Sequence, residues 1–159
     1  MNTRYLPTLY FLMLFLPLSG QPLSSILSVA EKSMSSKNYY DAFLKYKEAL
    51  EFEPTNAEYM FKAAEAGRQL GAYKQSGDFY EQVLAHELNN NYPNAAFYSA
   101  QMRQIQGQYD KAIASYKIYI SEQSNDTSDL CIQAKKEIKL LKNARSLYCK
   151  SKKVGKRFR

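Results

Sequence analysis

The 159-residue sequence predicts an all-α fold, in which three helical hairpins stack into a solenoid and one further helix covers its end. Glycine and proline are scarce, at 6 and 5 residues, whereas an all-β sandwich needs a turn about every 8–12 residues. A pattern of tyrosines and small residues returns after about 34 residues, which is a typical length for a unit of two helices. A final segment has apolar residues at a spacing of three or four, which is typical of one more amphipathic helix.

Residues 1–21 resemble a secretory signal peptide and are not expected to belong to the fold. Arg4 precedes the almost wholly apolar run Leu6–Leu18, and residues 19–21 then supply a small, polar exit. The run is shorter than the roughly 20 residues that cross a bilayer as a helix, and Pro17 interrupts it. We therefore expect an exported protein, located in the periplasm or at the periphery of the outer membrane. A retained anchor is the alternative.

The repeat is visible in three sets of residues that are separated by the same two intervals. These sets are Tyr39, Tyr73 and Tyr109, then Tyr46, Tyr80 and Tyr116, and the alanines Ala30, Ala64 and Ala100, each set spaced by 34 and 36 residues. Gly71 and Gly107 stand at the expected bend, where the left-handed backbone that ends a helix favours glycine. Lys37 takes that place in the first unit.

Small residues lie one helical turn before the second set of tyrosines, and they allow two helices to cross closely. They are Ala42, Ser76 and Ala112. Pro54 should end the second helix of the first unit, and Asn56 is well placed to cap the next helix. At this spacing the tyrosines are expected in the core, and not on a surface that stacks nucleic-acid bases.

The segments YYDAFLKYKEALEFEPTN and GQYDKAIASYKIYI resemble tetratricopeptide repeats, because their Gly, Tyr, small and aromatic positions stand in that family's register. The resemblance implies a right-handed α-solenoid of three tetratricopeptide units over residues 22–126. We place the units at 23–56, 57–92 and 93–126, with a slightly longer loop at the end of the second. Three units are about the minimum that stacks stably.

Residues 127–149 are predicted to form a C-terminal capping helix. Its inward positions at 3–4 spacing are Leu130, Ala134, Ile138, Leu141, Arg145 and Tyr148, with lysines largely between them. Such a helix commonly covers the exposed end of a solenoid.

The charge of the chain, +7, is concentrated in the tail at 150–159, which holds six basic residues and no acid. Residues 22–149 hold 15 basic and 15 acidic residues, so a basic domain face for nucleic acid is not supported. We expect this tail to be unstructured. It is either a solvated terminus or a contact to an anionic surface, such as lipid headgroups or a cell-wall polymer.

In tetratricopeptide repeats the first helix of each unit lines a concave groove that holds a peptide or another protein. The resemblance places seven candidate partner-binding residues there: Glu31, Phe61, Glu65, Arg68, Phe97, Gln101 and Gln104. Phe61 and Phe97 would offer an aromatic floor, or would instead belong to the core between repeats. Some family members clamp a C-terminal carboxylate with Lys and Asn, but Leu27 and Glu31 stand at those positions here.

The sequence contains no constellation that indicates catalysis, a metal or a cofactor. We find no phosphate-binding glycine loop, no Ser/His/Asp set and no CxxC, and the single histidine cannot form a multi-histidine site. Cys131 and Cys149 are 18 residues apart, or about 27 Å along an intact helix, so they should not bridge. The sequence therefore favours a binding protein over an enzyme.

A narrower resemblance concerns the segments NAEYMFKAAEAGRQLGAYKQSGDFYEQVL, NNYPNAAFYSAQMRQIQGQYDKAIASYKIYI and AKKEIKLLKNA. They look like the N-terminal repeats of OmpA-family envelope proteins linked to type IX secretion. The resemblance implies a non-catalytic scaffold or adaptor in the bacterial cell envelope, with envelope or secretion-machinery proteins as partners and no nucleic acid. The alternatives are a periplasmic chaperone that holds exported clients, and attachment to an anionic envelope polymer through the basic tail.

Overall fold

The computed structural model describes residues 22–85, 91–123 and 128–155, and side chains as far as residue 147. These residues form only helices. The helices are α1 (Leu23–Ser35), α2 (Tyr39–Phe52), α3 (Ala57–Leu70), α4 (Tyr73–Ala85), α5 (Ala95–Ile105), α6 (Tyr109–Glu122) and α7 (Asp129–Gly155). The predicted signal peptide (1–21), part of the predicted longer loop (86–90) and the end of the tail (156–159) lie outside the described residues.

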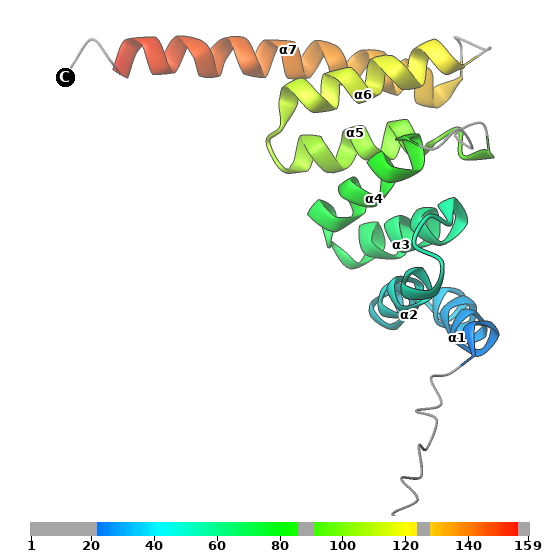
Figure 1. The fold of residues 1–159 in the computed structure, drawn as a ribbon. Helices are drawn as coiled ribbons and strands as arrows, with labels where there is room; N and C mark the ends of the chain where they lie inside the picture. Colours follow the sequence, from blue (N-terminus) through cyan, green and yellow to red (C-terminus); the bar gives the residue numbers. More distant parts are fainter. Residues whose placement is uncertain (1–21, 86–90, 124–127, 156–159) are drawn as a thin grey trace, which may run out of the picture.

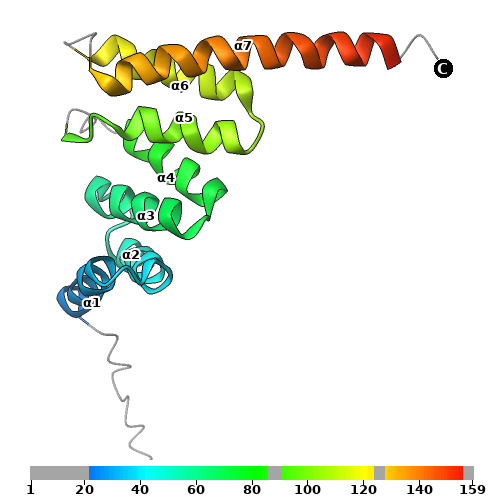
Figure 2. The same ribbon diagram turned by 180° about the vertical axis from the view of Figure 1, so that it is seen from behind.

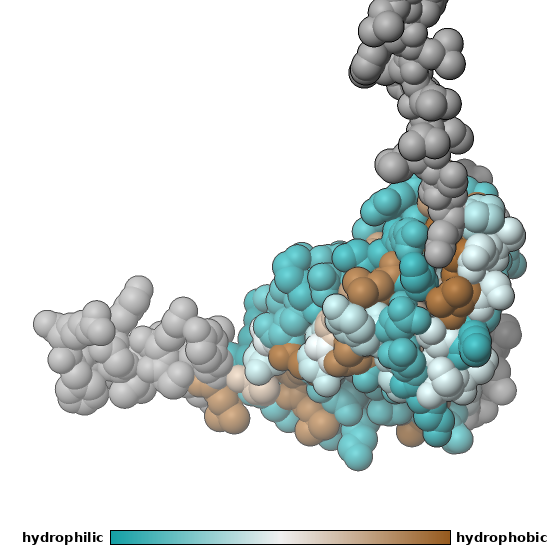
Figure 3. All heavy atoms as spheres, turned by 90° about the horizontal axis from the view of Figure 1, so that it is seen from below, coloured by the Kyte–Doolittle hydropathy of each residue, from teal (hydrophilic) through white to brown (hydrophobic). Residues whose placement is uncertain are grey.

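The helices stack in chain order, each against the next, from α1 at one end to α7 at the other (Figure 1). The view from behind shows the same order and shows α7 extending well past α6 (Figure 2). Seen from the α1 end, the surface carries separate hydrophobic patches between hydrophilic areas (Figure 3). The described residues include no helix that is both long and apolar enough to cross a membrane. The three hairpins and the closing helix confirm the predicted fold class.

The bends within the hairpins share one backbone geometry, as the repeat predicts. Gly71 and Gly107 have φ angles of 90° and 71°, and Lys37 has a φ of 61°. In each bend the residue that follows donates its N–H to the carbonyl oxygen five residues earlier, over 2.8–2.9 Å. This hydrogen bond is the mark of the Schellman motif, which requires a left-handed residue at the end of the helix. Lys37 therefore adopts a conformation that costs a residue with a side chain about 1 kcal/mol or more.

The tyrosines and their small partners form the core, as expected. Tyr46, Tyr80 and Tyr116 are fully buried, and so are the six small residues around them, Ala30, Ala42, Ala64, Ser76, Ala100 and Ala112. Asn56 caps α3 by accepting hydrogen bonds from the N–H groups of Glu58 and Tyr59. The helix α2 ends at Phe52, two residues before Pro54.

Helix α7 differs from the prediction in its length. It begins at Asp129 and continues to Gly155, so the expectation of an unstructured tail is wrong for residues 150–155. The physical reason is local, because neither glycine nor proline occurs between 129 and 154 and lysine is a good helix former. Cys131, Ala134 and Leu141 of α7 are buried against α5 and α6, whereas Arg145, predicted inward, is exposed. The buried Cys131 thiol is free, and the helix that carries both cysteines is continuous.

Candidate functional site

Side-chain contacts link the first helices of the units, α1 to α3 and α3 to α5, and link α5 to α7. The face that these helices share carries two open pockets. The larger, of about 370 Å³, lies between α3 and the segment that leads into α5. It is lined by Glu58, Phe61, Lys62, Asn91, Tyr92, Pro93 and Asn94. The smaller, of about 260 Å³, lies between α5 and α7 and is lined by Gln101, Gln104, Ile105, Tyr116 and Glu137. We call this face, with both pockets, the groove.

At the α1 end of the groove, Glu31 is exposed and forms an ion pair with Lys62 of α3. Lys62 also pairs with Glu58, at 3.0 Å. The hydrogen bond from the Lys62 ammonium lowers the pKa of Glu31 below its ordinary value. Glu31 thus stays ionised at neutral pH and ties the first two units together.

In the middle of the groove, Glu65 and Arg68 are engaged inside the protein. The Arg68 guanidinium donates to the Glu65 carboxylate at 2.6 Å and to the Tyr80 hydroxyl at 3.3 Å, and Tyr80 donates to Glu65. The guanidinium also lies 4.4 Å from the centroid of the Tyr98 ring of α5, a cation–π contact. Burial raises the pKa of Tyr80 well above its ordinary value, so its hydroxyl keeps its proton. Glu65 and Arg68 are half-buried and, with the fully buried Tyr80, act mainly as the floor between two units.

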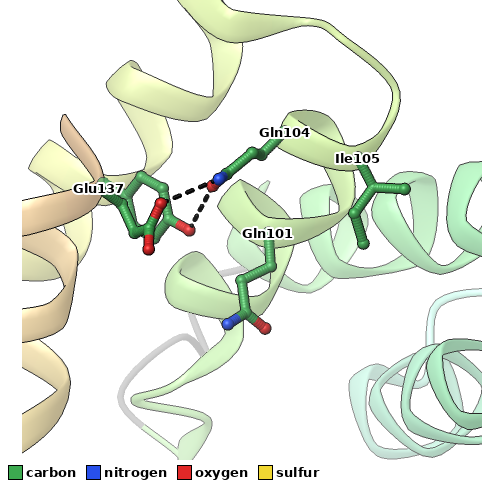
Figure 4. Close-up of a pocket in the computed structure, with 5 residues that line it drawn as sticks. Gln101, Gln104, Ile105 and Glu137 are labelled. Atoms are coloured by element: carbon green, nitrogen blue, oxygen red, sulfur yellow. Dashed lines mark hydrogen bonds between the residues drawn. The ribbon is translucent and has the colours of Figure 1, made fainter. Parts of the chain in front are cut away.

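At the α7 end, Gln104 connects three helices (Figure 4). Its amide nitrogen donates to the Glu137 carboxylate of α7 at 2.9 Å, and its amide oxygen accepts from the Tyr116 hydroxyl at 2.9 Å. Gln101 lies one turn away on α5 and points away from this cluster, with no bond drawn to it (Figure 4). Its half-buried amide and the exposed Ile105 lie on the wall of the smaller pocket.

The two phenylalanines predicted to form an aromatic floor have different surroundings. Phe61 is half-buried and stacks on Tyr92, with 4.7 Å between ring centroids. Phe97 is 1% exposed and packs edge-on against Tyr116 and Tyr119, at 5.5 and 5.4 Å. The prediction that Phe97 contacts a partner in the groove is therefore wrong, and the alternative of a core position holds for it. The cause is the helix that follows, because Phe97 belongs to the core cluster that α7 closes with Cys131 and Ala134.

The groove also contains residues outside the seven candidates, and four of them make contacts that matter here: Lys62, Tyr92, Tyr98 and Glu137. Lys62 and Tyr98 stand at the same repeat position, 36 residues apart, and each contacts the unit before its own. That shared position follows each predicted phenylalanine directly and was available as a signal. Glu137 carried no such signal, because its place in the groove depends on how α7 packs.

The chemistry of the groove is that of a binding surface. Within the described ranges, no three His, Cys, Asp or Glu side chains are grouped so that they could hold a metal ion. The groove offers two stacked aromatic rings, Phe61 and Tyr92, in the larger pocket, a lysine beside them, and amide groups in the smaller pocket. Side chains of these kinds contact peptides through ring stacking, charge pairing and hydrogen bonding.

Comparison with known proteins agrees with the fold. No family model matches the chain. A curated relative, the tetratricopeptide repeat and J domain-containing co-chaperone DNJ1 of Cryptococcus neoformans, is 27% identical over 128 residues, which are 78% of this chain but only 24% of the relative. The chain thus spans about a quarter of that relative's length.

Solved structures give the same assignment. The tetratricopeptide domain of Sgt2 from Aspergillus fumigatus has a TM-score of 0.62 and 21% identity, covering 82% of this chain and 83% of that one. The type III secretion chaperone SycD of Yersinia enterocolitica, in complex with a peptide of the translocator YopD, has a TM-score of 0.64 and 14% identity, covering 81% and 98%. The fold is therefore a tetratricopeptide-type, right-handed α-solenoid of three hairpins with a capping helix. It places this chain in the structural class of α-helical repeat solenoids.

Proposed function

We propose that this chain is a non-catalytic scaffold that holds a segment of a partner protein in the groove. The observation that carries the proposal is Phe61, a half-buried ring stacked on Tyr92 that lines the larger pocket beside the Lys62 ammonium. Such a pocket accepts an apolar side chain of the partner. The likeness to SycD, whose structure holds a peptide of YopD, supports this use of the fold.

The charges of the groove favour a defined partner over a chaperone that holds many unfolded clients. A holding chaperone needs a broad apolar surface. Here the groove carries the ion pair of Arg68 with Glu65 in its middle and that of Lys62 with Glu31 at its α1 end, and both are satisfied internally. The side chains that remain for a partner are confined to the two pockets, which suits a short segment with side chains at a fixed spacing.

The proposed setting is the bacterial cell envelope, with an envelope or secretion-machinery protein as the partner. The support is the sequence of residues 1–21, a single basic residue followed by an apolar run and a small, polar exit. We expect the N-terminal sequence of the protein recovered from its native cells to begin near residue 21 or 22. Recovery of an N-terminus at Met1 in a cytoplasmic fraction would overturn the export proposal while leaving the groove proposal intact.

The groove is tested by crosslinking from matched positions. A benzophenone amino acid replaces Ile105, which lines the smaller pocket on a first helix, or Ile118 on the second helix α6; both are exposed isoleucines. We expect one discrete crosslinked product from position 105 in native cells and none from position 118. Phe61→Ala should reduce that product at least tenfold, whereas Phe52→Ala, at an exposed phenylalanine of α2, should not.

Two outcomes would contradict the groove. Equal products from positions 105 and 118 would show that the contact is not confined to this face. Equal loss from both phenylalanine variants, with helicity unchanged by circular dichroism, would show that Phe61 has no specific role. A ladder of many products from position 105 would instead favour the chaperone.

A further inference from the structure

The last helix has a geometry that its packing in the solenoid does not require. It has 27 residues, against 11–14 in the other helices, and is roughly 40 Å long. The C-terminal part of α7 extends beyond α5 and α6, as both ribbon views show (Figures 1 and 2). Leu141 is the last buried residue of α7 among the described side chains, and residues 142–147 are all exposed.

The outer side of α7 carries a second row of apolar residues. Ile132, Leu140 and Leu147 are 56%, 50% and 67% exposed. They are eight and seven residues apart, close to two turns each, so they lie along one side of the helix. The buried Cys131, Ala134 and Leu141 occupy the other side. Hydrophobic side chains are visible next to the point where the grey C-terminal part begins (Figure 3). We call the exposed apolar residues, with the lysines described next, the outer face.

Positive charge surrounds this apolar row. Four exposed lysines, Lys135, Lys136, Lys139 and Lys142, lie along the same stretch of α7. Residues 129–159 hold 11 basic and 2 acidic residues, whereas residues 22–128 hold 10 basic and 13 acidic ones. The segment from 129 therefore carries +9 and the repeats −3. A charge density of this size and sign complements an anionic surface.

We infer that α7 docks by its outer face on an anionic phospholipid bilayer and lies in the plane of the lipid headgroups. A long, basic helix of low overall apolarity with a row of leucines and isoleucines is the kind of helix that binds at this interface. The inference does not depend on the groove, because Glu137, the α7 residue that lines the groove, is not part of the outer face.

The composition of the row distinguishes a bilayer from a protein helix as the occupant. Lys136 and Asn143 lie between Ile132, Leu140 and Leu147 on the same side of α7. A partner helix packed on this row would bury the Lys136 ammonium in a dry interface, which is costly unless it is paired. At a bilayer surface the same lysine extends to the headgroup phosphates while its methylene groups stay on the apolar side. An acidic helix is therefore the less suitable occupant.

The solenoid keeps α7 in place while its outer face is occupied. Gln104 bonds Glu137 at 2.9 Å, and Arg145 pairs with Asp110 of α6 at 2.8 Å. Both contacts are made to the repeats and leave the apolar row exposed. Docking would thus hold the three units beside the membrane surface.

The experiment measures binding to vesicles by co-sedimentation. The protein is residues 22–159, because the apolar run before it would itself enter lipid; this segment contains all of the described core clusters, and circular dichroism checks that it folds. The vesicles are phosphatidylcholine alone or phosphatidylcholine with phosphatidylglycerol at 3:1. We expect binding only to the vesicles that contain phosphatidylglycerol, weakened by salt.

Two variants and one matched control locate the contact. Replacing Lys136, Lys139 and Lys142 by Gln should lower the partition coefficient about a hundredfold. The control replaces by Gln three exposed lysines on other helices, Lys47 of α2 and Lys111 and Lys117 of α6, and so changes the net charge by the same amount. This control should lower binding less than threefold. Replacing Ile132, Leu140 and Leu147 by Ser should lower binding on the order of tenfold, with the loss persisting at high salt.

Three results would overturn the inference. Equal losses from the two lysine variants would mean that net charge alone attracts the protein. Full binding by the Ser variant would mean that the apolar row does not enter the interface. Failure of the protein to bind the anionic vesicles would contradict docking on a bilayer. If the protein then bound an acidic amphipathic helical peptide tightly, the outer face would be assigned to a protein partner.

Discussion

The spacing of the three repeats continues into the last helix, but the last helix lacks the bend that divides each repeat into two helices. Ala134 of α7 comes 34 residues after Ala100, and Leu141 comes 34 residues after Gly107. The three repeats place a left-handed residue at that bend, Lys37, Gly71 or Gly107. At Leu141 the chain instead stays helical, and its side chain is 4% exposed against the core. A buried leucine in place of a bend residue turns the start of a further hairpin into one long helix.

The two regions also differ in how they are held. Each helix from α2 to α6 has a neighbouring helix on two sides, so large side chains such as Tyr46, Tyr80, Phe97 and even Arg103 become buried. α7 has α6 as its main neighbour, and it buries only small or medium side chains: Cys131, Ala134 and Leu141. We therefore expect the repeats to carry the stability of the protein, and α7 to carry charge and exposed surface.

The largest test of this difference is Phe97→Ala. The ring is buried between Tyr116 and Tyr119, and its removal leaves a cavity where the third unit meets α7. We expect a loss of about 4 kcal/mol in the free energy of unfolding, measured by urea denaturation. The control Leu147→Ala on the exposed side of α7 should change it by less than about 0.5 kcal/mol. A loss below about 1.5 kcal/mol for Phe97→Ala would mean that α7 is packed too loosely to close this core.

The next test compares two arginines. The Arg103 side chain is 4% exposed and pairs with Asp78 and Glu81 of α4 at 2.9 and 2.5 Å, whereas Arg145 of α7 is 58% exposed beside Asp110. Arg103→Ala should cost about 2–3 kcal/mol, because it removes a buried side chain together with its two ion pairs to the neighbouring repeat. Arg145→Ala should cost at most about 0.5 kcal/mol, as an exposed pair does. Similar costs would contradict the contrast, and thermal unfolding of both variants measures it.

The pH dependence of Arg103→Ala sharpens the same contrast. Partial burial alone would raise the pKa of Asp78, but hydrogen bonds from Lys74 and Arg103 outweigh it and lower this pKa below 3.8. A carboxyl with a lowered pKa stabilises the fold above its unfolded pKa and loses this effect as the pH falls through the folded value. The stability gap between wild type and Arg103→Ala should be constant above about pH 5 and shrink below about pH 4. A gap that stays constant at pH 3 would rule out ionic coupling.

The repeats could be predicted because each structural requirement has its own residue type. A bend needs glycine or a tolerant residue, a close crossing needs alanine or serine, and the core needs tyrosine; these recur at 34 and 36 residues. The groove could be predicted only in part. Phe61 and Phe97 occupy the same repeat position, yet Phe97 is buried because its unit is followed by α7. The role of Glu137 and the helical state of residues 150–155 depend on the packing and length of α7, which no repeat specifies.

The smallest expected effect concerns the bend that departs from the pattern. Lys37 has a φ of 61° where the other two units have glycine, and its N–H still donates to Met34 as Gly71 and Gly107 donate to their own helices. Lys37→Gly removes the Cβ that strains the backbone at a positive φ, which stabilises the folded state by about 1 kcal/mol or more. It also increases the conformational entropy of the unfolded chain, which offsets part of that gain. We expect a net gain of about 0.5 kcal/mol in unfolding free energy by urea denaturation. Lys37→Ala keeps the Cβ and its strain, so it should give no gain. Equal stability of Lys37→Gly and Lys37→Ala would mean that a side chain at this left-handed position causes no strain. The difference between the bends and the uninterrupted α7 would then need another explanation.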